Sequence, residues 1–193
     1  MFHIHRNLLC EASPVFKAAF LGDTDYTETT AQEMTLSGPE ITIQAMELLV
    51  QWLYTKDYDL KPIRKGDTQG RYMQLASLFV LAEEYIMVDL KNNIIDRLFE
   101  LQAARLQPPQ IPIIEVIYEN TPISSPFRLL LAAYYAWHVD MDWYAGAEST
   151  KVLHSHPIFA ADVAVQMGKR LSGKHQSPFT QPASQLYSSN SAS

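Results

Sequence analysis

The chain has 193 residues, of which 15 are basic and 21 acidic, giving a formal net charge of −6. This acidic balance disfavours a surface that neutralises nucleic-acid phosphates or anionic lipid, so we expect no direct nucleic-acid partner and no membrane partner. The single cysteine excludes an internal disulfide, no apolar run reaches the ~20 residues of a membrane span, and the N-terminus lacks a signal-peptide pattern. The sequence therefore predicts a protein of the cytoplasm or nucleus.

Helical spacing organises the first hundred residues. Residues at intervals of four, three and four line one side of the first helical turns: Leu9, Ser13, Phe16 and Phe20. Ser13-Pro14 is expected to divide these turns into two helices. The short apolar run Met34–Leu36, which a Ser-Gly-Pro turn signal follows, indicates a strand.

The clearest amphipathic helix comes next. Its apolar residues recur at i, i+3, i+4, i+7 and i+8: Met46, Leu49, Val50, Leu53 and Tyr54. A loop or short strand with Pro62, Gly66 and Gly70 separates it from two further helices. The stripes of those helices are Leu75, Leu78, Phe79 and Ala82, then Leu90, Ile94, Leu98 and Leu101. They meet at Glu83-Glu84-Tyr85, which predicts a helical hairpin.

The second half of the chain begins with a proline-rich stretch. Residues 106–112, LQPPQIP, contain three prolines and predict a stiff linker. Helices are expected from Pro112 to Tyr118, after Ser125-Pro126, and after His156-Pro157. The aromatic side chains here have helical spacing, which favours core packing over an exposed recognition surface: Tyr134, Tyr135, Trp137, Trp143 and Tyr144.

The final 22 residues, 172–193, contain seven serines, three glutamines and little apolar content. Such a segment buries too little apolar surface to order itself, so the sequence predicts a disordered tail whose deletion leaves stability unchanged.

The order of these features resembles that of a known family. The pattern H-x₃-L-x₃-S-x₂-F at His5 to Phe16 is followed by LLVQWLYT at 48–55 and LFVLAEEYIMVDLKNNIIDRL at 78–98. This succession resembles the BTB/POZ domain over residues 2 to about 103. The stretch VIYENTPISSPFRLLLAAYYAW at 116–137 is similar to a fungal branch of the family with a helical C-terminal extension.

The resemblance implies an α+β, mainly helical fold, with a BTB/POZ-like helical core, a small sheet and a short helical extension. The expected organisation is a BTB/POZ-like domain over 1–105, a linker over 106–112, a helical extension over 113–171 and a tail over 172–193. Phe2 and Ile4 would lie in a strand and face inward. The family's first strand would precede Phe2, so the resemblance describes an N-terminally shortened domain.

BTB/POZ domains are protein-interaction modules, many of which dimerise or join cullin-based ubiquitin ligases as substrate adaptors. In cullin-binding members a hydrophobic-x-Glu motif follows the helix of the second phenylalanine, and Tyr26-Thr27-Glu28 fits this pattern after Phe20. An aromatic anchor with a carboxylate suits docking onto a basic partner. Arg6 stands where the family places a basic residue in a charged pocket. Tyr26, Glu28 and Arg6 are therefore the predicted protein-binding residues, and a self-associating scaffold with nuclear, transcription-related partners is the alternative.

The opening residues also raise a metal hypothesis. His3 and His5 precede Cys10, and His154 and His156 form a second His-x-His pair. A structural zinc site needs four ligands and a catalytic one about three plus a water, so both pairs would have to meet in space. Cys10 sits beside a core leucine, where a thiol acts as a small apolar residue.

Other enzyme signatures are missing from the sequence. GDTQGR at 66–71 lacks the Gly-Lys-Ser/Thr ending of a phosphate-binding loop. Glu83 and Glu84 diverge by about 100° on a helix, which suits a solvated face better than an acid/base pair. We therefore predict no catalytic residue, no cofactor and no metal. A metal hydrolase that uses the His-x-His pairs is the alternative from another class.

Overall fold

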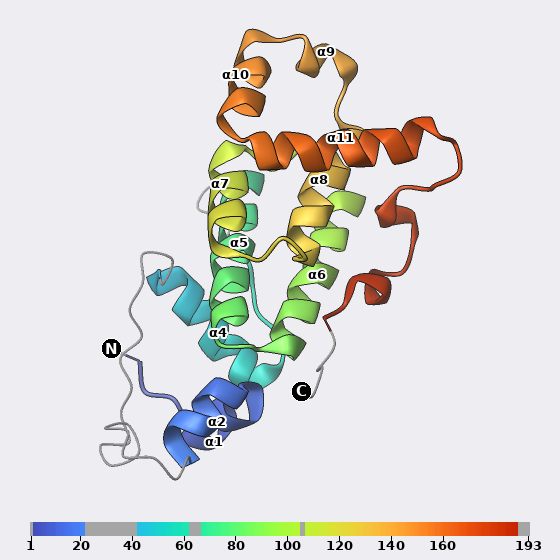
Figure 1. The fold of residues 1–193 in the computed structure, drawn as a ribbon. Coiled ribbons are helices and arrows are strands. Elements are labelled where there is room, and N and C mark those ends of the chain that lie inside the picture. Colours follow the sequence, from blue (N-terminus) through green and yellow to red (C-terminus); the bar gives the residue numbers. More distant parts are fainter. Residues whose placement is uncertain (1, 22–41, 62–66, 105–106, 189–193) are drawn as a thin grey trace. The chain divides into compact units, whose positions relative to one another are not determined.

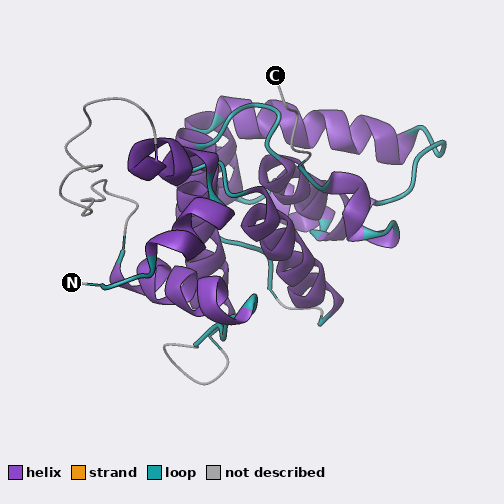
Figure 2. Ribbon diagram, turned by 90° about the horizontal axis from the view of Figure 1, so that it is seen from below, coloured by secondary structure: helices purple, strands orange, loops and turns teal. Residues whose placement is uncertain are grey.

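The computed structural model describes residues 2–21, 42–61, 67–104 and 107–188, and every regular element there is helical (Figures 1 and 2). None of the helices in these ranges is long and apolar enough to cross a membrane. The chain divides into two compact units, residues 1–94 with 188–193, and residues 95–187.

The division falls inside α6 (Val88–Ala103), and not in the proline-rich segment expected as a linker at 106–112. Part of that segment packs within the second unit, because the Tyr135 hydroxyl donates a hydrogen bond to the Pro109 carbonyl at 2.6 Å. Pro109 is buried as well. Proline stops a helix, but it does not prevent the extended chain that follows from joining a core.

The first unit opens with two short helices, α1 (Arg6–Ala12) and α2 (Pro14–Leu21). Ser13 lies between them in an extended conformation, with φ −146° and ψ 125°. Proline disfavours the helical conformation in the residue that precedes it, which explains the break. The predicted division at Ser13-Pro14 is confirmed.

The small sheet expected from the resemblance is not confirmed. Residues 2–5 form no strand, Phe2 is 40% exposed, and Ile4 is only half-buried, so the expectation that both face inward is wrong for Phe2. An extended segment becomes a strand only when a neighbour completes its backbone hydrogen bonds, and no such neighbour occurs within the described ranges. The strand predicted at Met34–Leu36 lies outside those ranges.

The predicted amphipathic helix is α4 (Ile43–Thr55), which begins after Thr42, whose side chain accepts a hydrogen bond from the Ala45 N–H at 3.0 Å. Its buried face consists of Ala45, Met46, Leu48, Leu49, Trp52 and Leu53. Tyr54, expected on this face, is 49% exposed. The buried stripe is therefore rotated towards Trp52.

Helix α5 (Thr68–Glu84) buries every residue from Gln74 to Ala82, although the sequence predicted only one apolar stripe. Small residues, Ala76 and Ser77, occupy positions between the large apolar ones, so all sides of the helix pack closely. A helix that is buried on all sides belongs in the interior of its unit, even where it includes polar residues such as Gln74 and Ser77.

A three-residue turn joins α5 to α6, as the tight junction in the sequence predicts. The Met87 N–H donates to the Ala82 carbonyl at 2.8 Å, and Ile86 adopts a left-handed conformation with φ 52°. Lys91 and Glu83 form an ion pair across the turn, with 3.0 Å between Nζ and Oε2.

The second unit contains α7 (Ile111–Asn120), α8 (Pro126–His138), α9 (Met141–Tyr144), α10 (Ala147–Ser155) and α11 (Pro157–Leu171). Figure 1 shows α11 crossing α7 and α8, and these three helices pack together as the predicted small bundle. Its core includes Phe127, Leu130, Leu131, Phe159 and Val163. The starts expected at Ser125-Pro126 and His156-Pro157 are confirmed.

A buried arginine closes the turn between α7 and α8. Arg128 is 6% exposed, and its Nη2 donates to the Tyr118 carbonyl at 2.5 Å and to the Thr121 carbonyl, while Nε donates to Thr121 Oγ1 at 3.1 Å. The Tyr118 hydroxyl in turn donates to Asp162 of α11 at 2.8 Å. Burial, together with this hydrogen bond, raises the pKa of Tyr118, so the group stays a neutral donor.

The segment after α11 differs from the predicted disordered tail. Residues 173–188 include two 3₁₀ turns, η1 (Pro178–Thr180) and η2 (Ala183–Leu186). Phe179 packs against aromatic rings of the second unit, and Tyr187 bonds to Asp96. The disordered tail was predicted from the average composition of the segment. An average does not show how much a single aromatic side chain can contribute to docking.

Candidate protein-interaction site

Helix α1 carries apolar side chains that are partly exposed. None of its seven residues is buried, although it contains Leu8 and Leu9, which are half-exposed. Phe2, just before it, is 40% exposed. We call Phe2, Arg6, Leu8 and Leu9 the α1 face. Partly exposed apolar side chains together with an exposed cation on the same helix match the composition of an interaction surface.

The segment before α1 is held by Tyr54 of α4. His5 donates its backbone N–H to the Tyr54 hydroxyl at 3.4 Å, and the same hydroxyl lies 2.6 Å from His5 Nδ1. The two rings meet edge to face, with 5.7 Å between their centroids. His5 therefore has a structural partner, and the same contact gives the Tyr54 hydroxyl a hydrogen-bond partner.

Ser13 and Phe16 attach the first two helices to the α5–α6 turn. The Ser13 hydroxyl donates to the Tyr85 carbonyl at 2.5 Å and accepts the Phe16 N–H at 3.2 Å. The Phe16 ring stacks on the Tyr85 ring, with 4.7 Å between centroids and 13° between planes. Burial, reinforced by the charge of Glu84, raises the pKa of Tyr85. These contacts fix the position of α2 and, through it, the α1 face.

The three predicted binding residues have different outcomes. Arg6 is the first residue of α1 and is exposed, so its side chain is accessible to a partner. Tyr26 and Glu28 lie outside the described residues. The buried Phe20 that precedes this motif is part of α2, which ends at Leu21.

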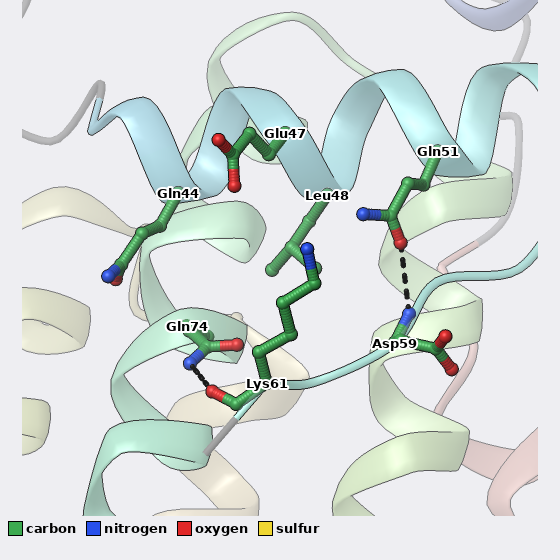
Figure 3. Close-up of a pocket in the computed structure, with 7 residues that line it drawn as sticks. All are labelled: Gln44, Glu47, Leu48, Gln51, Asp59, Lys61 and Gln74. Carbon is green, nitrogen blue, oxygen red and sulfur yellow. Dashed lines mark hydrogen bonds between the residues drawn. The ribbon is translucent and has the colours of Figure 1, made fainter. Parts of the chain in front are cut away.

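A small polar pocket that the sequence did not predict lies beside α4 (Figure 3). It measures about 240 Å³ and is lined by Gln44, Glu47, Leu48, Gln51, Asp59, Lys61 and Gln74. Gln51 Oε1 accepts the Asp59 N–H at 3.1 Å, and Gln74 Nε2 donates to the Lys61 carbonyl at 2.6 Å (Figure 3). Amides, two carboxylates and one ammonium around a leucine suit polar contacts with a protein surface.

The sequence contained one indication of this pocket: Gln44, Glu47 and Gln51 have helical spacing and share the polar side of α4. The loop residues Asp59 and Lys61 come close to this side only through the tertiary fold. The segment that holds them had been predicted only as an intervening loop or strand.

The histidine pairs show no metal-binding arrangement. Within the described residues, no three His, Cys, Asp or Glu side chains are grouped so that they could hold an ion. His156 Nε2 lies 3.4 Å from Glu115 Oε1, and His154 is exposed. Cys10 is half-buried, with its Sγ 3.9 Å from the Phe16 carbonyl oxygen, in keeping with a packing role.

Comparison with known families gives the class of this protein. A family model for the BTB/POZ domain matches residues 1–102, which is more than half of the chain. That domain is a non-enzymatic fold whose members bind protein partners and self-associate. The chain belongs to the BTB/POZ family. No curated protein and no solved structure matches it.

Proposed function

We propose that this chain is a protein-interaction adaptor that self-associates through the α1 face. The observation that supports this most directly is that α1 buries none of its residues although it contains two leucines, and that Phe2, shortly before it in the chain, is exposed. A second copy would cover these side chains and so remove apolar surface from water, which is the dominant favourable term in association.

The charge of Arg6 suits a role in orientation. Arg6 is exposed at the start of α1 and points to a different side of the helix from Leu8, two residues on, which would put it at the rim of the proposed interface. Rim charges mainly affect the association rate and its salt dependence, whereas buried apolar anchors determine the dissociation rate. We therefore expect Arg6→Gln to alter salt dependence more than affinity.

The test is the molar mass in solution, measured by sedimentation from micromolar to hundreds of micromolar protein. Phe2→Asp and Leu8→Asp should shift the chain towards monomer, because each places a carboxylate in the proposed interface. Ile123→Asp is the matched control, because Ile123 is 82% exposed in the second unit. A monomeric wild type over this range, or a dimer that resists both variants, would refute self-association through α1.

A second candidate function is docking onto a cullin scaffold as a ubiquitin-ligase adaptor. The motif Tyr26-Thr27-Glu28 after Phe20 favours it, because a tyrosine can fill an apolar pocket while Glu28 sets orientation against a basic partner. Calorimetry with a cullin N-terminal region should show Tyr26→Ala weakening binding more than Glu28→Gln. No wild-type binding at tens of micromolar would exclude the adaptor role.

We place this protein in the cytoplasm or nucleus, where an unpaired cysteine such as Cys10 stays reduced. Fluorescence microscopy of the tagged chain tests both compartments. A nuclear signal with a stable dimer and no cullin binding would favour a scaffold with transcription-related partners.

A further inference from the structure

The segment that follows α11 is attached to the second unit through a few side chains. Residues 172–176 are all exposed, and Gly173 among them adopts a left-handed conformation with φ 65° and open space around its Cα. This stretch therefore acts as a tether between α11 and the residues that dock after it.

Phe179 is the main docking side chain. Its ring lies 5.2 Å from that of Phe99 on α6, and it meets the rings of Tyr134 and His138 on α8 edge to face at 5.9 and 5.5 Å. These are favourable geometries for aromatic pairs, so three rings from two helices hold one phenylalanine.

Tyr187 makes a second contact, eight residues further on. Its hydroxyl donates to Asp96 Oδ1 at 2.6 Å, and Asp96 lies three residues before Phe99 on α6. Residues three apart share one face of a helix, so both contacts fall on the same side of α6. The hydrogen bond to Asp96, assisted by burial, raises the pKa of Tyr187 to about 12, which keeps the hydroxyl protonated as a donor.

The aromatic site continues into a hollow of about 660 Å³. Its lining includes Tyr134 and His138, which touch Phe179, together with Gln102 and Trp143. The surface can therefore receive more chain than the single ring it now contacts.

We propose that Asp96, Phe99, Tyr134 and His138 form a binding surface for an extended peptide carrying a phenylalanine and, eight residues later, a tyrosine. The chain's own segment from Ser177 to Tyr187 occupies this surface and competes with the peptide. The contacts of Phe179 and Tyr187 define the chemistry of the partner. This goes beyond the proposed self-association, because it involves neither the α1 face nor the Tyr26 motif.

The tether decides how strongly the segment competes. A short flexible tether gives its end an effective concentration in the millimolar range. A free peptide that binds the open surface with a dissociation constant of about 100 μM is then weakened about tenfold or more by the tethered copy. Only a partner that binds well, or a change that releases the segment, opens the surface.

The test uses the full chain and a fluorescent peptide with the sequence of residues 173–188. The chain variant Phe179→Ala frees the receiving rings without altering them, so it should bind the peptide at least about tenfold more tightly than the wild-type chain. Leu171→Ala, which changes a residue 85% exposed on α11, is the control and should bind as the wild type does.

Two further comparisons assign the effect to the proposed contacts. A peptide that carries Phe179→Ala should lose most of its affinity, and Phe99→Ala added to the Phe179→Ala chain should abolish binding while circular dichroism shows an intact helical fold. Asp96→Asn in the same background should weaken binding without any effect on folding.

Release of the segment can be tested separately by hydrogen exchange. Ser177 is 7% exposed, and its hydroxyl is buried without a hydrogen-bond partner among the described residues. A carboxylate there, in Ser177→Asp, should expel the segment and speed amide exchange over 177–187, whereas Ser184→Asp at an exposed position should not.

Equal peptide affinity of the wild-type and Phe179→Ala chains, or of the two peptides, would overturn the proposal.

Discussion

Phe16 and Leu53 are each 1% exposed, and both lie on apolar stripes that the sequence shows directly. Replacing either with alanine should lower the free energy of unfolding by about 2–5 kcal/mol, because the surrounding core relaxes only partly around the space left behind. Urea denaturation measures this, with Ile123→Ala at an 82% exposed site as control. Losses below about 0.5 kcal/mol for both would place them on the surface.

Arg128 stabilises the turn between α7 and α8 by donating hydrogen bonds to three acceptors. Replacing it should therefore destabilise the fold through unsatisfied polar groups, and not through a cavity as at Phe16 or Leu53. Arg128→Leu leaves the carbonyls of Tyr118 and Thr121 without their donor, and we expect it to cost about 2–5 kcal/mol. Arg128→Lys should recover only part of this, because an ammonium lacks the planar fork.

The control for Arg128 is Arg97→Leu, which removes an arginine that pairs with Glu100 at 2.8 Å near the surface. Exposed pairs contribute about 0–1 kcal/mol. Equal losses for the two arginine variants would contradict the assigned role of Arg128.

His138 should make stability depend on pH. Burial, and then the charge of Arg170, lowers the pKa of His138 below its ordinary value near 6.5. As the pH falls through that value, the unfolded chain takes up a proton before the folded one does, so stability is full above about 6.5 and declines below it. Unfolding measured from about pH 5 to about pH 8, which brackets the ordinary histidine pKa, should show a weaker decline of stability at low pH for His138→Gln. An identical decline for both chains would contradict this.

The turn between α5 and α6 contains a strained residue. Ile86 has φ 52°, a conformation that costs a β-branched side chain about 1–2 kcal/mol. Glycine relieves this strain but adds freedom to the unfolded chain, so Ile86→Gly should raise stability by about 0.5–1 kcal/mol. Ile86→Val keeps the branching and should bring no gain, and a loss of stability in Ile86→Gly would show that the turn needs the side chain.

Most helices could be predicted from local patterns. The break at Ser13-Pro14, the starts of α8 and α11, and the tight α5–α6 junction depend on interactions within a few residues, such as proline sterics and helical spacing. The buried side of α4 and the complete burial of α5 depend on which neighbours cover each helix. A single sequence contains no direct record of those neighbours.

The C-terminal segment shows the clearest difference between what the composition predicts and what the fold contains. Composition alone predicts that deleting residues 173–193 leaves stability unchanged. The contacts of Phe179 and Tyr187 predict a loss of about 1–3 kcal/mol on deletion, because a partly buried aromatic ring and its partners return to water. Thermal and urea unfolding measure the loss, and Phe179→Ala alone should reproduce most of it. An unchanged midpoint would favour the disordered tail.

The amino-acid sequence was enough to predict the BTB/POZ family and the mainly helical class, both of which are confirmed, while Arg6, Tyr26 and Glu28 stay predicted binding residues. The sequence was enough because helix periods, proline positions and the order of motifs are local properties of the chain. The tertiary structure decided that α1 stays on the surface, that the two compact units divide within α6, and that Phe179 docks against three aromatic rings. Each of these depends on side chains far apart in sequence, whose contacts arise only when the whole chain balances apolar burial against conformational entropy.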